Sequence, residues 1–322
     1  MSPICCLLLV AAQTTPLDYK KSAGPAEVET MDLDWKDKTR DRDVPVWLYV
    51  PKGSGPFPVI IFSHGLGGSR QGYAYLGKHW ASHGYVLVHL QHKGSDDAVW
   101  KESKQWLEAM RKAARDPANL RNRPLDVRFA VDQMENLNKE GKLKGRLNLE
   151  KVGMAGHSFG AYTTLAAAGQ TFFTPAGKPL RLAEPRLKAA IAMSPNAPAR
   201  KTDRVKSFDS IKIPIFHLTG TRDDGVGITD TRPADRRVPY DNIKGAPQYL
   251  LILKDGDHMV FSGARRPTAG LGKKDAVFHD LIRMGTTAFW DAHLKGDSKA
   301  LDWLTSKFKK RLGAEGTFES EK

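Results

Sequence analysis

The chain alternates short, almost uninterrupted apolar runs with longer segments in which apolar residues recur at helical spacing. The apolar runs are typical of strands covered on both faces, as in a parallel sheet, and the longer segments are typical of amphipathic helices. The runs span residues 57–62, 85–90, 152–155, 189–193, 213–218 and 248–253, and the predicted helices span residues 71–82, 125–137, 161–168 and 277–293. This alternation predicts an α/β fold: one mostly parallel central sheet with helices on both faces, in a single domain over residues 43–322.

The two ends of this domain are also predicted from the pattern. Residues 44–50 (VPVWLYV) alternate and are rich in β-branched residues, so we expect an edge strand there. Residues 13–42 are polar and mixed, which indicates an extended lead-in. Residues 248–253 are predicted to be the last strand, and residues 277–293 the closing helix.

Two long segments do not follow the strand–helix pattern, and both could border a binding site. Residues 91–123 carry aromatic and charged side chains, among them Trp100 and Trp106. So long a connection either covers a site, as a lid over residues 93–123, or forms two surface helices. Residues 172–186 form a loop that is broken by prolines and would also border the pocket.

The most informative stretch is Gly156-His157-Ser158-Phe159-Gly160, between an apolar run and a helix start rich in small residues. This strand–turn–helix context is that of a nucleophile elbow, a sharp turn that lifts a serine hydroxyl clear of the sheet. Glycine is needed on both sides because a Cβ there would collide with the neighbouring strand and helix. Ser158 is therefore the candidate nucleophile; the alternative is an inert turn serine.

A glycine-rich loop, Ser63-His64-Gly65-Leu66-Gly67-Gly68, follows what we take as the third strand. In α/β hydrolases this loop supplies one N–H of the oxyanion hole, and the residue after the nucleophile supplies the other. The backbone N–H groups of Leu66 and Phe159 are therefore the candidate donors. His64 is expected to support the loop rather than to act as a base. The alternative is a plain glycine-rich turn.

A serine hydroxyl is a poor nucleophile at neutral pH and needs a base that is oriented by an acid. His258, after the last predicted strand, is the candidate base. The acid is expected after the preceding strand, at Asp223 or, alternatively, at the adjacent Asp224, and Asp223 is preferred because it stands four positions after Thr219. These residues all follow strands, at the edge of the sheet where open α/β folds bind ligands.

Two other acids and three other histidines are less suitable as catalytic residues. Asp255 and Asp257 are too close in sequence to His258 to be its partner. Three histidines are expected to be structural, the first at a helix terminus: His83, His157 and His217.

The charge composition indicates which classes of partner the protein favours. The net charge is +14, from 50 Lys+Arg against 36 Asp+Glu, which favours contact with an anionic surface or polymer. The basic residues are dispersed and form no recognition motif, so we expect no specific nucleic-acid binding.

The first twelve residues contain an apolar run that ends in small residues and resembles a signal peptide, although it has no basic start. It predicts export to the periplasm or the exterior, with a cytoplasmic location as the alternative. Cys5 and Cys6 both lie in this run, so a processed chain would have no disulfide, cysteine nucleophile or thiolate metal site. Neither a cofactor nor a metal is expected.

Three stretches, FPVIIFSHGLGGSR, ASHGYVLVHLQH and VGMAGHSFGAYT, resemble the platelet-activating-factor acetylhydrolase branch of the α/β-hydrolase superfamily. Bacterial proteins labelled predicted dienelactone hydrolases of that group are similar as well. The resemblance covers residues 44–293. It implies a calcium-independent serine esterase that cleaves short or oxidised acyl chains from phospholipids or other small esters. By position it implies Ser158 and His258 as catalytic residues, and Leu66 and Phe159 as oxyanion donors.

Two departures weaken the transfer of that specificity. Eukaryotic acetylhydrolases carry the acid after the strand that here ends at Met193, and the following Ser194-Pro195-Asn196 contains no carboxylate. The acid must therefore follow the next strand. Dienelactone hydrolases use a cysteine nucleophile, whereas this chain has Ser158, so their name does not describe an activity here.

Three other functions remain as alternatives to a serine esterase of short-chain or phospholipid-type esters. The first is a polyester or cutin hydrolase, which is similar in outline. The others are a serine peptidase on the same fold and a binding protein without catalysis. The acyl chain length, the alcohol and the oligomeric state are not determined by the sequence.

Overall fold

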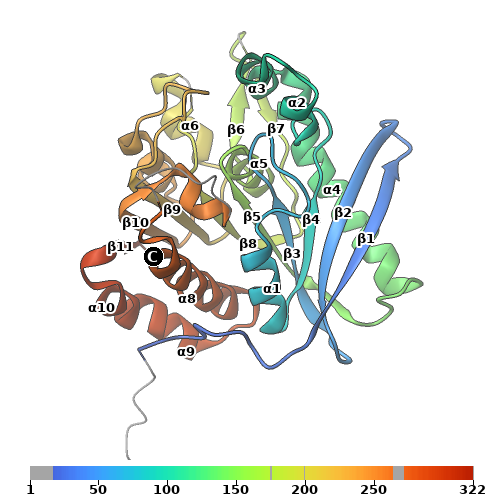
Figure 1. Cartoon of the computed structure of the whole chain (residues 1–322), viewed down its shortest axis with the longest axis vertical. Helices are drawn as coiled ribbons and strands as arrows, with labels where there is room; N and C mark the ends of the chain where they lie inside the picture. Colours follow the sequence, from blue (N-terminus) through green and yellow to red (C-terminus); the bar gives the residue numbers. More distant parts are fainter. Residues whose placement is uncertain (1–16, 175, 199, 264–271, 322) are drawn as a thin grey trace, which may run out of the picture.

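The computed structural model describes residues 17–174, 176–198, 200–263 and 272–321, and the structural statements below refer to them. They form a nine-stranded sheet in the order β1-β2-β4-β3-β5-β8-β9-β10-β11, with helices on both faces (Figure 1). The central strands from β4 to β10 are parallel, and β1, β2 and β11 pair antiparallel at the two ends. The strands of this sheet are β1 (Val28–Asp37), β2 (Arg42–Pro51), β3 (Phe57–Ser63), β4 (Val86–Leu90), β5 (Leu147–His157), β8 (Leu187–Met193), β9 (Ile215–Arg222), β10 (Gln248–Asp257) and β11 (Gly316–Glu321).

The helices connect these strands and extend the chain beyond β10. The α-helices are α1 (Ala74–Ser82), α2 (Ala98–Lys101), α3 (Trp106–Arg115), α4 (Pro117–Lys139), α5 (Phe159–Ala168), α6 (Arg204–Phe208), α7 (Val238–Asn242), α8 (Asp275–Leu294), α9 (Ser298–Asp302) and α10 (Phe308–Leu312). Short 3₁₀ turns are η1 (Lys201–Asp203), η2 (Pro233–Arg237), η3 (His258–Ser262) and η5 (Gly313–Glu315), and η4 (Trp303–Lys307) is a π-helical turn.

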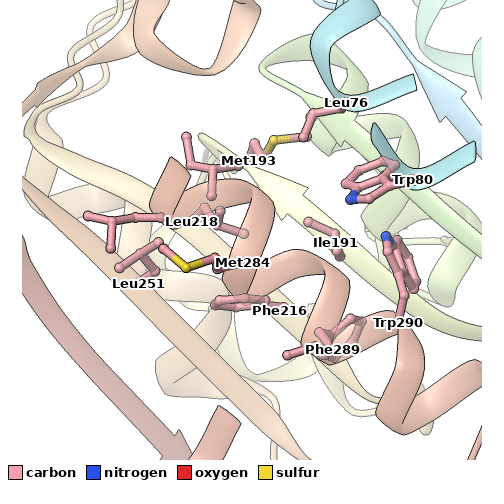
Figure 2. Close-up of a cluster of buried hydrophobic side chains, with 14 of the residues drawn as sticks. Leu76, Trp80, Ile191, Met193, Phe216, Leu218, Leu251, Met284, Phe289 and Trp290 are labelled. Carbon is pink, nitrogen blue, oxygen red and sulfur yellow. The ribbon is translucent and has the colours of Figure 1, made fainter. Parts of the chain in front are cut away.

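Alternate residues of the central strands enter two separate cores, one on each face of the sheet. In β3, Ile60 belongs to the core with α1 and α8, and its neighbour Ile61 belongs to the core with α4 and α5. Figure 2 shows part of the first core, where Trp80 of α1 and Trp290 of α8 pack edge to face with ring centroids 5.9 Å apart. The predicted fold class, a mostly parallel sheet with helices on both faces, is confirmed.

The edges of the sheet differ from the prediction. The strand at residues 44–50 is not an edge, because β2 pairs with β1 on one side and with β4 on the other. The edge is β1, which lies inside the segment predicted to be a lead-in. At the opposite end, β11 pairs with β10 after α8 to α10, so β10 is not the last strand.

Helix α4 begins earlier than predicted and runs through Pro124. A proline inside a helix leaves the carbonyl four residues earlier without its N–H donor, which is a reason to predict a boundary there. Here that carbonyl belongs to Leu120, and the Tyr162 hydroxyl donates to it at 3.1 Å. A tertiary hydrogen bond thus replaces the missing helical one.

The predictions for the N-terminal segment and for residues 172–186 have different outcomes. The predicted signal peptide, residues 1–12, lies outside the described residues. Within the described ranges, no helix combines the length and the apolar character needed to cross a membrane. Residues 172–186 contain a two-stranded hairpin, β6 (Thr171–Phe173) and β7 (Pro179–Arg181), rather than an irregular loop.

Several histidines are buried with their rings out of water, and burial lowers their pKa because it disfavours the charged imidazolium. The pKa of His92 falls to about 3, and those of His89 and His217 fall to about 4. Between those values and the ordinary pKa of about 6.5, the unfolded chain binds protons that the folded chain does not. The free energy of unfolding must therefore fall as the pH drops below about 6.5.

We expect each such histidine to contribute a slope that approaches about 1.4 kcal/mol per pH unit near pH 5 and is smaller towards pH 6.5 and pH 4. Urea unfolding at a series of pH values measures that slope for the wild type and for His217→Gln. Among the described residues, the imidazole of His217 bonds only to Gln248, at 2.7 Å, and it lies outside the catalytic region described below. A His217→Gln slope equal to that of the wild type would contradict the assignment of this histidine as neutral and buried.

Candidate active site

Ser158 is the first residue after β5 and stands immediately before α5. Its backbone has φ 58° and ψ −115°, a strained conformation for a residue with a side chain. Its N–H donates to the Met193 carbonyl at 2.9 Å, which fixes the turn against β8. The side chain is half-buried and lines a cavity. The turn has the geometry of a nucleophile elbow.

The glycines around Ser158 are required by close packing. A Cβ on Gly156 would lie 2.3 Å from the Gly160 carbonyl oxygen, and a Cβ on Gly160 would lie 1.9 Å from the Ser63 carbonyl oxygen. Both distances are far inside van der Waals contact, and both involve backbone atoms. No larger residue fits at either position without moving the turn.

His258 is the first residue after β10 and reaches Ser158 from the neighbouring part of the sheet. Its Nε2 lies 2.9 Å from the Ser158 Oγ. On the other side of the ring, Nδ1 lies 2.7 Å from Asp223 Oδ1. Asp223 itself is the first residue after β9. The three predicted side chains are therefore brought together in the order that base-assisted nucleophilic attack requires.

The carboxylate of Asp223 is fully buried, and Thr219 Oγ1 donates to its Oδ2 at 2.8 Å. Burial alone would raise the pKa of Asp223, but the hydrogen bond with His258 and the positive charge of Arg236 outweigh it and lower the pKa to about 2. The carboxyl group is therefore ionised at neutral pH. Asp224, the alternative, is exposed, and its Oδ1 accepts from the Val226 N–H instead of contacting the histidine.

Arg236 contacts the acid of the candidate site, and this role was not predicted from the sequence. Its side chain is 2% exposed, and its Nε lies 3.2 Å from Asp223 Oδ1. Its other N–H groups donate to the Ser194 carbonyl at 2.9 Å and the Asp224 carbonyl at 2.8 Å, and also to Asn196 Oδ1. Arg236 therefore joins the turns that follow β8 and β9.

The two residues predicted to supply backbone N–H groups for an oxyanion, Leu66 and Phe159, lie near Ser158. Leu66 lies in the loop after β3, and Phe159 is the first residue of α5, where the helix dipole favours negative charge. Both residues line the cavity that contains Ser158. The loop passes close to the nucleophile, because a Cβ on Gly65 would lie 3.4 Å from the Ser158 Cβ. Among the described residues, neither N–H donates to another protein atom.

The histidines that were expected to be structural occupy such positions. His64 is buried, with Nδ1 2.6 Å from the Gly65 carbonyl oxygen, while its Nε2 accepts from the His92 N–H at 3.1 Å. His157 Nδ1 lies 2.8 Å from the Tyr73 hydroxyl. His83 caps the C-terminus of α1. In the described part of the chain, no group of three His, Cys, Asp or Glu side chains could hold a metal ion.

The cavity at Ser158 has a volume of about 750 Å³ and is mainly apolar. The segment after β4 forms part of its wall, because Trp100, Trp106, Met110 and Leu120 all line the cavity. Helices α2 and α3, at the top of Figure 1, therefore border the cavity that contains Ser158. Trp100 Nε1 donates to the Gly67 carbonyl at 2.8 Å, which joins this segment to the loop of the oxyanion donors.

A smaller cavity of about 270 Å³ lies beside the first one, and Phe172 and Phe173 of the hairpin line it. Tyr162 and Asn196 line both cavities. The hairpin thus borders this second cavity and is not part of the lining of the larger one.

Comparison with known proteins shows similarity to ester hydrolases. The family model of platelet-activating factor acetylhydrolase, isoform II, matches residues 48–177, which contain the loop after β3 and Ser158. A platelet-activating factor acetylhydrolase of Cavia porcellus is 30% identical over 145 residues, which are 37% of this chain and 33% of that protein. The chain therefore spans about a third of the length of this relative.

Two further relatives are ester hydrolases by name. A putative phospholipase A2 of Schizosaccharomyces pombe is 27% identical over 164 residues, or 38% of this chain and 37% of that protein. Cutinase 2 of Thermobifida cellulosilytica is 24% identical over 194 residues, or 60% of this chain and 58% of that protein. The fold is consistent with that of the α/β hydrolases, and over the matched segments the chain is similar to platelet-activating factor acetylhydrolases, a putative phospholipase A2 and cutinases.

Proposed function

We propose that this protein is a serine carboxylic ester hydrolase that acts on short-chain or phospholipid-type esters through an acyl-enzyme intermediate. The observation that carries the proposal is the hydrogen-bonded series from Ser158 through His258 to Asp223, with contacts of 2.9 and 2.7 Å, at the wall of an apolar cavity. The similarity to acetylhydrolases and cutinases supports the same reaction class.

In the proposed first half-reaction, Ser158 Oγ attacks the ester carbonyl carbon while His258 Nε2 takes its proton. Asp223, ionised and buried, stabilises the imidazolium that forms. The carbonyl oxygen becomes an oxyanion, which the N–H groups of Leu66 and Phe159 would bind. Collapse of the tetrahedral intermediate breaks the bond to the alcohol, and His258 returns the proton to that leaving oxygen.

In the second half-reaction, water replaces the alcohol. His258 takes a proton from the water as its oxygen attacks the acyl carbon, and a second oxyanion forms at the same donors. Collapse breaks the bond to Ser158 Oγ, which recovers its proton from His258. The acid leaves, and no metal or cofactor takes part in the proposed reaction.

A polyester hydrolase is the second candidate. Three exposed apolar side chains, Trp106, Val226 and Met259, lie at the cavity from three different segments. Such a rim suits a bulky apolar substrate or a surface as well as it suits a free ester. The match with cutinases extends over more of the chain than the match with acetylhydrolases.

The proposed function also concerns a lid, the extent of the domain and the location of the protein. We propose that residues 93–123 act as a lid, because several of them line the cavity that contains Ser158 and because Arg111 donates to the Gly227 carbonyl at 2.7 and 3.0 Å, next to the lining residues Val226 and Ile228. We also propose that the sheet from β1 to β11 and the helices around it function as one domain, which thus begins before residue 43, and that the protein is exported. Its positive charge would favour anionic lipid or polymer surfaces.

A series of p-nitrophenyl esters with acyl chains of increasing length tests this function, with a p-nitroanilide of the same acyl group as the control. We expect ester hydrolysis with the highest kcat/KM for short chains, and little amide hydrolysis. A preference for long chains, together with soluble products from polyester film, would favour the second candidate. Amide hydrolysis at a comparable rate would favour a peptidase.

A further inference from the structure

One arginine, Arg123, is buried near the site, and no carboxylate among the described residues binds it directly. Arg123, in α4, has no exposed surface. Its guanidinium donates to the hydroxyl oxygens of Thr163, Ser95 and Ser63, each at 2.9 Å, and to the carbonyl oxygen of His64. Every one of these acceptors is a neutral group. Because a buried charge without a bound counter-ion is costly, its position calls for a physical reason.

The carboxylate of Asp126 is connected to Arg123 by hydrogen bonds through two other side chains. Arginine cannot accept a hydrogen bond, so Ser63 Oγ accepts from Arg123 and its own proton is free for His92 Nε2, which lies 2.9 Å away. His92 Nδ1 then donates to Asp126 Oδ2 at 2.9 Å. The carboxylate of Asp126 is held at its other side by Arg42.

Ser63, His92 and Asp126 thus repeat the order of groups at Ser158, but they do not form a second nucleophilic site. All three are fully buried, and the Ser63 oxygen already accepts from Arg123. Burial also lowers the pKa of His92 to about 3, so the ring is neutral. What this series of hydrogen bonds does is hold the guanidinium of Arg123 in one orientation.

Arg123 contacts both sources of the oxyanion donors. Through the His64 carbonyl it holds the loop that carries Leu66, two residues further on. Its guanidinium also lies over the ring of Phe159, 4.5 Å from the ring centroid. The two donors come from segments far apart in the sequence, and one rigid, planar cation lies against both.

We propose that Arg123 is a positioning residue of the oxyanion hole, whose guanidinium fixes the Leu66 loop and Phe159 relative to each other and places a positive charge behind their N–H groups. This inference rests on the proposed ester hydrolysis. A planar fork with several donors suits the role because it can bind the loop and the α5 helix at once. Its benefit appears when negative charge develops on the carbonyl oxygen, that is, in the transition state.

The test compares Arg123→Met, which keeps the length without the charge, with Arg123→Lys, which keeps the charge without the fork. For p-nitrophenyl acetate we expect Arg123→Met to lower kcat by about 10² to 10³, as does the loss of one oxyanion donor, with KM changed less than about threefold. Arg123→Lys should lose about tenfold, the equivalent of one hydrogen bond. Inactivation by diethyl p-nitrophenyl phosphate, whose phosphoryl oxygen needs the same donors, should slow by the same factors.

Two controls separate positioning from loss of folding. Arg146→Met removes a cation at the start of β3, where Arg146 binds Glu29 and the Pro51 carbonyl away from this hydrogen-bonded series, and it should lower the melting temperature without lowering kcat. In Arg123→Ala, added guanidinium chloride at millimolar concentration should restore activity, whereas urea, which is similar in shape but uncharged, should not. Titration of active sites by the burst of p-nitrophenol counts competent molecules in each variant.

Each outcome has a defined meaning. Folded Arg123→Met with wild-type kcat, or equal losses in Arg123→Met and Arg146→Met, would overturn the proposal. If the methionine and alanine variants do not fold, Arg123→Lys decides: a tenfold lower kcat per competent site supports the proposal, and an unchanged kcat overturns it. A wild type without ester hydrolysis that depends on Ser158 would instead overturn the proposed function.

Discussion

Ser158→Ala is expected to lower kcat for p-nitrophenyl acetate by about 10⁴ to 10⁶. The alanine removes the atom that forms the acyl-enzyme, and what remains is the smaller rate that the oxyanion donors and substrate binding supply to water attack. KM should change little, because the cavity keeps its shape. Steady-state release of p-nitrophenol, with a burst measurement at high enzyme concentration, gives both quantities.

The matched control for this variant is Ser54→Ala, at an exposed serine in the turn between β2 and β3. It should behave as the wild type in both measurements. A burst of p-nitrophenol from Ser158→Ala, with an amplitude close to one per chain, would show that another residue forms the covalent intermediate.

Asp223→Asn is expected to lower kcat by about 10⁴. An amide at this position can donate to His258 Nδ1, which would hold the ring in the wrong tautomer, with the proton on Nε2, where it cannot accept the proton from Ser158. The neighbouring residue offers a control of the same chemistry: Asp224→Asn should keep kcat within about threefold, because that carboxylate is exposed and contacts the Val226 N–H.

The two asparagine variants are compared by kcat at several pH values between 6 and 9. The same large loss in both, or a loss in Asp224→Asn alone, would show that the acid is not Asp223. The loss in Asp223→Asn should persist across this range, because the pKa of Asp223 is lowered to about 2 and the wild-type carboxylate does not titrate there.

The parts of the fold and site with strong local patterns could be predicted. The buried strands are continuous apolar runs because helices cover both of their faces, and Ser158 was identified from glycines that packing requires. Strand β1 was missed although Met31, Leu33 and Trp35 alternate with charged residues. Its polar composition hid the two-residue period of a strand with one solvent face.

Other features depend on contacts that no local pattern reveals. Arg236 and Arg237 form one basic dipeptide, yet the side chain of Arg236 is 2% exposed and that of Arg237 is 38% exposed. The turn after β9 carries Arg236 toward Asp223, and nothing in the dipeptide distinguishes the two. The run of α4 through Pro124 likewise depends on the distant hydroxyl of Tyr162.

The central claim, a covalent intermediate on Ser158, is tested most directly by intact-mass measurement after reaction with a fluorophosphonate, followed by peptide mapping. We predict one adduct per chain, located on the peptide that contains Ser158, and its formation should parallel the loss of ester hydrolysis. An adduct on a different residue, or full inhibition without an adduct on Ser158, would contradict the claim.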